Sequence, residues 1–194
     1  MAALVPIVGV LALQGAFKKH AEMLQKLGVT VVEVRKPADL SKCDALIIPG
    51  GESTTIFKQI RFIELAEPLR EFAKSNPVFG TCAGLILISQ EIIGDTMQPF
   101  HLLDVSVERN AFGRQAESFH TEIDLQLKPG QHLPCQAVFI RAPRIRHVGD
   151  KVRVLAEYQG EPVLVQQGHH LGATFHPELT DNQTIHEYFL KVLN

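Results

Sequence analysis

The sequence has few cysteines, no long apolar run and no large excess of charge of either sign. Its three cysteines, Cys43, Cys82 and Cys135, are an odd number without a CxxC pair, which argues against a disulfide framework and a zinc ribbon. No apolar stretch approaches the roughly 18 residues of a membrane helix, and no basic-then-apolar leader opens the chain. A net charge of −2 and a pI near 6.5 give no positive field for nucleic acid or anionic membranes. We therefore expect a cytoplasmic protein that binds neither nucleic acid nor membranes.

Two familiar phosphate-binding loops are missing as well. The first apolar run leads into "LQGAF" (13–17), which lacks the GxGxxG pattern of dinucleotide-binding loops. The "PGGE" segment (49–52) is not followed by the Gly-Lys-Ser/Thr of a Walker motif. We expect no nucleotide and no other cofactor.

The apolar pattern predicts one domain, residues 1–194, that begins as an α/β protein. Strands and helices alternate through the first half, which is typical of a doubly wound, mostly parallel sheet with helices on both faces. The expected strands there are 7–13, 29–34, 44–51 and 77–80, and the expected helices are 17–28, 53–60, 62–75 and one from Ala83. Short strands then follow at 119–127, 135–140, 152–159, 161–167 and 170–175. Their spacing leaves no room for crossover helices, so we expect a largely antiparallel section before a last helix, 181–194, capped by Asp181 or Asn182.

The segment "GTCAG" (80–84) joins an expected strand to an expected helix and has a cysteine between two glycines. This is the form of a nucleophile elbow, in which a sharp turn presents the nucleophile and the glycines let neighbouring backbone approach. The helix N-terminus that follows favours the thiolate form of Cys82. The alternative is a small cysteine packed where strand meets helix.

A cysteine nucleophile needs a base, and "FHPE" (175–178) offers one. Pro177 fixes the backbone between His176 and Glu178, so a carboxylate can orient the imidazole beside Cys82, as acyl transfer requires. A zinc site with His169 and His170 is the alternative. Adjacent residues on a strand point to opposite faces, so those two histidines do not easily share a metal, and we expect none.

The segment "IIPGGESTT" (47–55) ends a parallel strand on the same sheet edge as the elbow. Backbone N–H groups of Gly50 and Gly51 can face a developing oxyanion there. Glu52 is expected at the mouth of the site, with Ser53 as the N-cap of the next helix. The alternative is a simple Pro-Gly-Gly turn.

Together these motifs carry a family resemblance. "PGGES", "GTCAG" and "FHPE" in this order resemble the class I, triad-type glutamine amidotransferases, which have a flavodoxin-like sheet. "GVLALQGAFKKH" (9–20), "VERNAFGRQ" (107–115) and "FIRAP" (139–143) narrow the resemblance to the glutaminase subunits of pyridoxal 5′-phosphate synthase. The resemblance spans nearly the whole chain.

The resemblance implies hydrolysis of L-glutamine to L-glutamate and ammonia through a cysteine thioester, without a cofactor. It also implies a partner, a (β/α)₈-barrel synthase subunit that uses the ammonia for vitamin B6 biosynthesis, in an assembly of twelve subunits of each kind. Cys82 is then the nucleophile, His176 the base and acid, and Glu178 the orienting acid. The remaining implied roles are an oxyanion hole from the amides of Gly51 and Ala83, a glutamine site from Gly50, Gly51, Glu52, Ser53, Arg109, Ile140 and Arg141, and oxyanion-hole ordering or partner contact by Gln14.

Three rival functions stay open at this point. One is an amidotransferase subunit of another pathway, such as histidine or aminodeoxychorismate synthesis, against which "RNAFGRQ" argues. Another is a cysteine hydrolase or chaperone-like protein on the same sheet, which would not need Glu52, Arg109 and Arg141 to bind a zwitterion. The third is a non-catalytic binding module, in which Cys82→Ala would change nothing.

Overall fold

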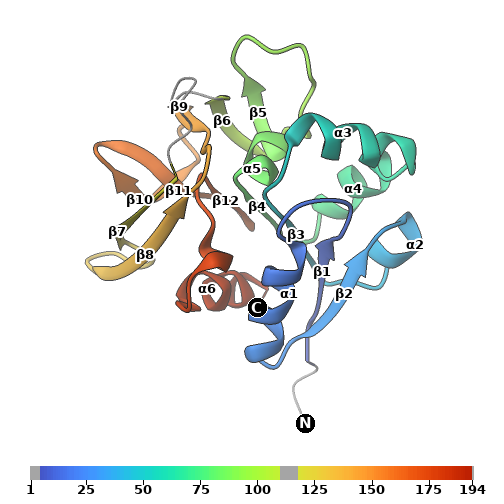
Figure 1. Ribbon diagram of the computed structural model, residues 1–194, viewed down its shortest axis with the longest axis horizontal. Coiled ribbons are helices and arrows are strands. Elements are labelled where there is room, and N and C mark those ends of the chain that lie inside the picture. The colour runs from blue at the N-terminus through green and yellow to red at the C-terminus, as the bar shows by residue number, and fades with distance from the viewer. Residues whose placement is uncertain (1–4, 110–117, 194) are drawn as a thin grey trace.

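The structure is a computed structural model that describes residues 5–109 and 118–193. A central sheet of seven strands has the order β10-β11-β12-β4-β3-β1-β2 (Figure 1). Its strands are β1 (Ile7–Leu11), β2 (Thr30–Val34), β3 (Ala45–Ile48), β4 (Val78–Thr81), β10 (Arg153–Tyr158), β11 (Glu161–Gln167) and β12 (His170–Ala173). The mixed α/β fold with a mostly parallel sheet is thereby confirmed.

Five neighbouring strands of this sheet, β2-β1-β3-β4-β12, are parallel. Counted along the chain this is the order 2-1-3-4-5, the flavodoxin-like arrangement. In such sheets ligands bind beyond the carboxyl ends of the strands, near the point where the strand order reverses. The loops after β1, β3 and β4 therefore converge on one edge of the sheet.

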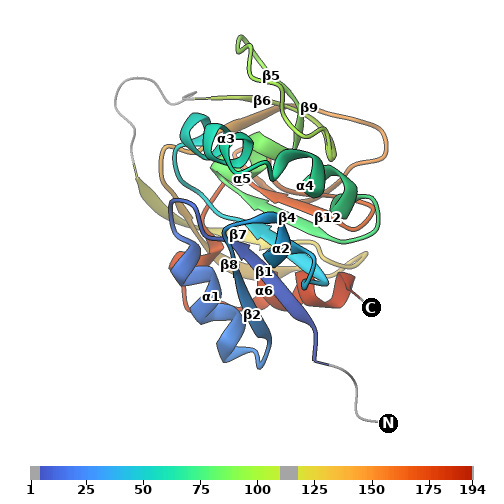
Figure 2. The ribbon, with the colours of Figure 1, turned by 90° about the vertical axis from the view of Figure 1, so that its right-hand side faces the viewer.

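Helices cover both faces of the sheet (Figure 2). On one face lie α3 (Ser53–Phe62), α4 (Ala66–Ala73) and α5 (Ala83–Ile88), and on the other lie α1 (Phe17–Lys26) and α6 (Thr184–Val192). Successive strand residues feed the two cores alternately: Leu46 and Ile48 pack on the α5 side, whereas Ala45 and Ile47 pack on the α1 side. This alternation is why a parallel strand buried on both faces is apolar throughout. A short helix, α2 (Pro37–Leu40), precedes β3.

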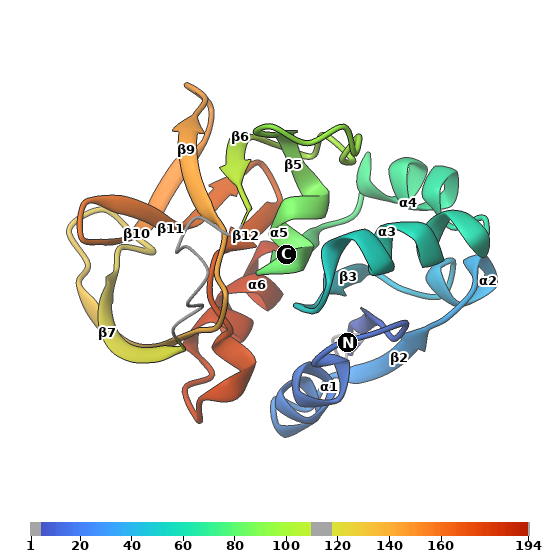
Figure 3. The same ribbon diagram turned by 45° about the horizontal axis from the view of Figure 1, so that its top comes forward.

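Two smaller sheets complete the molecule (Figure 3). One joins β5 (Ser89–Ile92), β6 (Leu103–Glu108) and β9 (Arg144–Val148), and the other is the antiparallel pair β7 (Phe119–Leu125) and β8 (Leu133–Phe139). The expected antiparallel section is confirmed for β7, β8, β10 and β11, but β12 pairs in parallel with β4 and antiparallel with β11. In the described ranges, 5–109 and 118–193, no helix is long and apolar enough to span a bilayer.

Two expected helix boundaries are wrong. The single helix expected over 62–75 begins only at Ala66, because Glu64 has a φ of 58° and reverses the chain after α3. The last helix begins at Thr184 and not at residue 181. Asn182 does accept a hydrogen bond from the Thr184 N–H at 2.9 Å, although it lies one residue before the N-cap, Gln183.

Candidate active site

Cys82 lies on a strained turn between β4 and α5. Its φ and ψ are 50° and −104°, outside the conformations that a side-chain-bearing residue normally adopts. The Cys82 N–H donates to the Ala173 carbonyl at 2.8 Å, which anchors the turn to the neighbouring strand β12. The expected elbow geometry is therefore present, with a buried thiol at the carboxyl edge of the sheet.

The two glycines around Cys82 are required by close backbone contacts. A Cβ on Gly80 would lie 2.5 Å from the Gly84 carbonyl group, and a Cβ on Gly84 would lie 1.9 Å from the Ile48 carbonyl oxygen in β3. Any side chain at either position would push α5 away from the sheet. The spacing of the motif thus reflects strand-to-helix packing as well as presentation of the thiol.

His176 and Glu178 are joined by the hydrogen bond that the intervening proline suggested. His176 Nδ1 lies 2.8 Å from Glu178 Oε1, and the His176 backbone N–H donates to Val138 in β8, also at 2.8 Å. Pro177 begins a single 3₁₀ turn, η1 (Pro177–Leu179). His176 is only 7% exposed and Glu178 only 3%. A buried carboxylate thus sets the orientation of a nearly buried imidazole.

The ionisation of this pair follows from its contacts. Burial lowers the pKa of His176, but the side-chain hydrogen bonds to Cys82 and Glu178 outweigh burial and raise it to about 10. Burial raises the pKa of Glu178, but its interactions with His20 and His176 outweigh burial and lower it. The arrangement therefore favours the imidazolium form of His176, which is the state in which it can protonate a leaving group.

The loop after β3 packs directly against this pair. A Cβ on Gly50 would lie 2.3 Å from Cε1 of the His176 ring and 3.3 Å from Cys82 Cβ. The Glu52 N–H donates to Gln14 Oε1 at 2.9 Å, so the loop after β1 holds the loop after β3 in place. Gly15, with a φ of 85°, also abuts the Gly50 carbonyl, where a Cβ would clash at 1.8 Å. Gln14 is thus placed where it can order this loop.

The expectation that Ser53 caps α3 is wrong, because Glu52 is the N-cap. The Glu52 carboxylate accepts from the N–H groups of Thr54 and Thr55 at 3.1 and 2.7 Å, and from the Thr55 hydroxyl at 2.6 Å. The Thr55 hydroxyl is the main cause of a Glu52 pKa lowered to about 2. Ser53 is the first residue of the helix and is buried.

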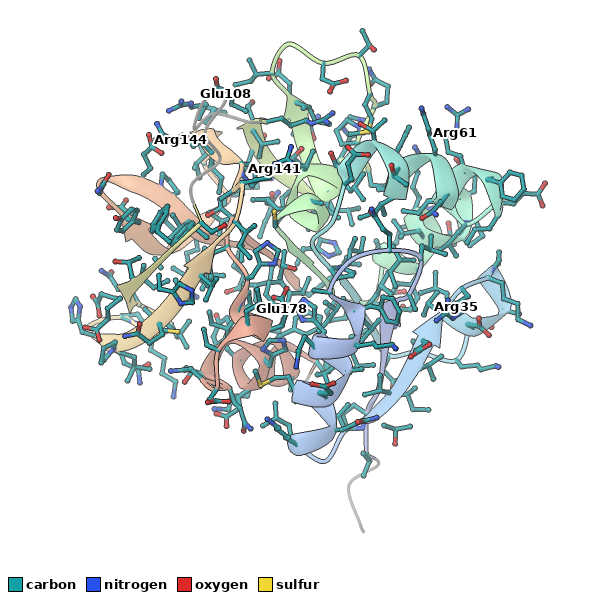
Figure 4. All side chains as sticks on the ribbon, viewed as in Figure 1. Arg35, Arg61, Glu108, Arg141, Arg144 and Glu178 are labelled. Carbon is teal, nitrogen blue, oxygen red and sulfur yellow. The ribbon has the colours of Figure 1, made fainter. Side chains whose placement is uncertain are left out.

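A cavity of about 240 Å³ opens in front of the cysteine. Its lining residues are Gly51, Glu52, Ser53, Cys82, Ala83, Ile86, Arg109, Ile140, Arg141 and His176. Of the residues expected to bind substrate, only Gly50 lies outside this lining, behind the His176 ring. Figure 4 labels Arg141, which follows β8 and has a φ of 47°, and Glu178 in η1. The cavity thus combines a nucleophile, one carboxylate and two guanidinium groups.

Arg109 is oriented by partners that the sequence did not suggest. Its guanidinium donates to Asp95 at 2.5 Å and to the Thr54 hydroxyl at 3.2 Å, and it lies 3.5 Å from Glu52 Oε1. Asp95 follows β5, a strand that the sequence patterns did not predict. Ile86 in α5 also lines the cavity and was not predicted to do so. Its position in the helix that follows the cysteine could have indicated this role.

The histidine pair of the zinc alternative is engaged elsewhere. His169 Nε2 lies 3.2 Å from the Ala73 carbonyl oxygen, and His170 Nδ1 accepts from the Val78 N–H at 3.2 Å. The first contact is at the end of α4 and the second at the start of β4, whereas Cys82 follows the end of β4. Within residues 5–109 and 118–193, no group of three or more His, Cys, Asp and Glu side chains is arranged to hold a metal ion.

The sequence profile of the SNO glutamine amidotransferase family matches residues 10–194. The chain belongs to this family. A relative from Desulforamulus reducens, named pyridoxal 5′-phosphate synthase subunit PdxT, is 50% identical over 188 residues, which are 96% of this chain and 99% of the relative. A protein of the same name from Pelotomaculum thermopropionicum is 51% identical over 185 residues, covering 95% and 93% of the two chains.

Solved structures give the same result for this family member. A crystal structure of a glutamine amidotransferase, 47% identical, superposes with a TM-score of 0.89 over 96% of this chain and 98% of that one. A chain of the PurLQS structure from Thermotoga maritima, at 16% identity and a TM-score of 0.76, shares the fold. The expected family resemblance is confirmed, although residues 110–115 of the "RNAFGRQ" segment lie outside the described ranges.

Proposed function

We propose that this family member is the glutaminase subunit of a pyridoxal 5′-phosphate synthase, acting as one class I glutamine amidotransferase domain over residues 1–194. It hydrolyses L-glutamine to L-glutamate and ammonia. The observation that carries this proposal is the meeting of Cys82, His176 and Gly51 around one cavity, with Glu178 hydrogen-bonded to His176. A cytoplasmic location belongs to the same proposal.

The chemistry assigned to these residues is acyl transfer in two halves. The Cys82 sulfur attacks the side-chain amide carbon of glutamine, and the amides of Gly51 and Ala83 stabilise the oxyanion that forms. His176 then protonates the amide nitrogen, the C–N bond breaks, and ammonia leaves a thioester on Cys82. A water molecule, deprotonated by His176, attacks the thioester carbon, and collapse of the second oxyanion breaks the C–S bond. The Cys82 sulfur then takes the proton back from His176 as glutamate leaves. Glu178 keeps Nδ1 of His176 protonated, so that Nε2 serves both proton transfers.

The rest of the cavity fits a zwitterionic amino acid. Free glutamine carries an α-ammonium and an α-carboxylate, so its site needs an acid and a cation at the end remote from the thiol. Glu52, with a low pKa, supplies the acid, and Arg109 and Arg141 supply cations that bind carboxylates through paired hydrogen bonds. Ser53 and Ile140 also line the cavity.

The partner proposed for this chain is the synthase subunit of the same enzyme, with a (β/α)₈-barrel fold and twelve copies of each subunit. Ammonia released to neutral water is mostly protonated and no longer nucleophilic, so transfer within a complex protects it. We propose that docking adjusts the Gly50–Gly51 loop, since Gln14 on the adjacent loop already holds the Glu52 amide. The isolated chain is then a slow glutaminase.

The test is glutamate formation from glutamine by the wild-type chain, with and without its synthase subunit. We expect low turnover alone and a stimulation of about tenfold or more on adding the subunit, because activity waits on the docked loop. If the synthase subunit of another glutamine-dependent pathway stimulated the chain instead, the partner proposed here would be wrong. Absence of glutamate in the assembled complex would overturn the proposal as a whole.

Glu52→Gln is expected to raise the KM for glutamine about tenfold and to change kcat less. The substitution removes the charge that faces the α-ammonium group, but it keeps an oxygen that can accept hydrogen bonds from the N–H groups at the start of α3. The main loss is therefore in the binding free energy of ground-state glutamine. Steady-state kinetics of the complex measure both constants. Glu67→Gln, an exposed carboxylate on α4, is the matched control. An unchanged KM in Glu52→Gln would remove Glu52 from the substrate site.

A further inference from the structure

Two histidines that the mechanism does not use are completely buried behind Glu178. His20 lies on α1 and His186 on α6, and both side chains are 0% exposed. These two helices are far apart in the sequence but lie on the same face of the sheet (Figure 1). Buried imidazoles are expected to make hydrogen bonds, so the partners of these two rings identify what they do.

The contacts lead to the free oxygen of the triad carboxylate. His20 Nε2 lies 3.3 Å from Glu178 Oε2 and 3.2 Å from the Thr81 hydroxyl, and His20 Nδ1 lies 2.9 Å from His186 Nε2. Glu178 Oε1 is the oxygen bonded to His176. Within the described ranges Glu178 Oε2 and His186 Nδ1 make no hydrogen bond of normal geometry. The ring nitrogen that faces Oε2, at 3.3 Å, is His20 Nε2.

The proton positions follow from elimination. Burial lowers the pKa of His20 and lowers that of His186 to about 3, so both rings are neutral and each carries one N–H. An unprotonated His20 Nε2 would direct a lone pair at the Glu178 carboxylate, which is repulsive. If His20 Nε2 carries the proton, His20 Nδ1 accepts a hydrogen bond from His186 Nε2–H. The unpaired ring nitrogen of His186, Nδ1, is then an acceptor. This is cheaper than the buried, unpaired N–H that the opposite tautomers would require.

We propose that His20 is a positioning residue of the active site, whose Nε2–H holds Glu178 Oε2 while His186 selects the tautomer of His20. The side chains then form one chain, from His186 through His20 and Glu178 to His176. This inference rests on the proposed function, because it assigns His20 a role in aligning the base of that reaction.

Few other charges face Glu178 from the elements packed against it. His176 is on the same turn, and β4 presents the neutral hydroxyl of Thr81. The groove that borders Glu178 on its outer side has the charged residues Lys19, Glu22, Lys26 and Asp181 in its lining. Lys19 and Glu22 pair with each other and are more than half exposed, so solvent screens them. His20 is thus a neutral donor, 3.3 Å from Oε2, that can favour the ionised carboxylate.

The experiment compares His20→Leu, His20→Gln and Leu24→Val with the wild type in the assembled synthase complex. His20→Leu should lower kcat about tenfold to a hundredfold with little change in KM, because the ionised carboxylate loses the polar N–H that faces it at 3.3 Å. It should also move the acidic limb of the kcat/KM profile upward by about one pH unit, because Glu178 is then protonated more easily. His20→Gln, which keeps a donor, should recover most of both losses. Leu24→Val, a buried apolar change on the same helix, should lower the Tm without moving the profile.

Thr81→Val is a nearly isosteric substitution that should not shift the acidic limb of the kcat/KM profile in the direction expected for His20→Leu. It removes the hydroxyl that shares the His20 N–H, so the acidic limb should move to lower pH or stay in place, and kcat should not fall. The rate of iodoacetamide modification of Cys82, located by peptide mass spectrometry, is followed in all variants. This modification rate should fall at pH 7 in His20→Leu even if glutamine proves not to be the substrate. The measurement therefore separates the role of His20 from the proposed glutaminase function. An unchanged profile in His20→Leu, a loss equal to that of Leu24→Val, or an upward shift in Thr81→Val would overturn the inference.

Discussion

Cys82→Ala is expected to lower the kcat of glutamate formation in the synthase complex about ten-thousandfold or more. The substitution removes the one sulfur in the described lining of the cavity, and water is a far weaker nucleophile than a cysteine sulfur beside His176. The variant should still bind glutamine, because the Glu52 and arginine end of the cavity is untouched. Glutamate release is measured with and without the partner, and glutamine binding is measured by calorimetry.

The matched control for this result is Cys43→Ala. Cys43 is also a buried free thiol, but it lies two residues before β3, where its Sγ donates to the Asp39 carbonyl at 3.3 Å. Burial, the larger cause, and the nearby Asp44 raise its pKa to about 11, so it is an inert thiol at neutral pH. Cys43→Ala should retain wild-type kinetics. Equal activity in the wild type and in Cys82→Ala would instead favour the non-catalytic binding module.

Gly50→Ala is expected to lower kcat about a hundredfold without unfolding the protein. The added methyl group would lie 2.3 Å from the His176 ring, which cannot rotate away freely because Glu178 holds Nδ1 and Pro177 fixes the backbone beside it. A displacement of the ring by about 1 Å is enough to cost two orders of magnitude in rate. The kcat of the complex, together with the Tm of the isolated variant, measures this effect.

Gly130→Ala separates this steric effect from the general cost of replacing a glycine. Gly130 lies in the turn between β7 and β8, with a φ of 72°, and an added methyl group there would have no atom within 4 Å. Its replacement should lower the Tm through backbone strain and leave kcat unchanged. If Gly50→Ala and Gly130→Ala had the same kcat, the contact between the loop after β3 and His176 would be irrelevant to catalysis.

Local patterns were sufficient for the elements that carry strong periodicity or a glycine motif. The β-branched run of β1 and the "GTCAG" segment both predicted their structures, because a doubly buried strand and a strained turn each restrict which residues fit. Helix boundaries that depend on the backbone conformation of a single residue were not predicted. The end of α3 is set by Glu64 in a left-handed conformation, and nothing in that residue type announces such a turn.

The cap of α3 shows why side-chain roles are harder to predict. Ser53 and Glu52 are adjacent, and a serine is the more usual N-cap. In the structure Ser53 is buried in the first turn, and Glu52 both caps the helix and faces the cavity. Arg109, which follows β6 in a different sheet, approaches the same carboxylate to 3.5 Å.

The sequence by itself determined the nucleophile motif, its glycines and the proline that joins His176 to Glu178. These features are local, since each depends on the conformation of a few consecutive residues. Only the tertiary structure decided that His20 and His186, 166 residues apart, meet behind Glu178, and that Asp95 orients Arg109. Such contacts depend on which helices share a face of the sheet and where separate strands end, and neither leaves a mark in the nearby residues. The sequence therefore specifies the reacting groups, whereas the packing of distant elements sets their orientation and charge.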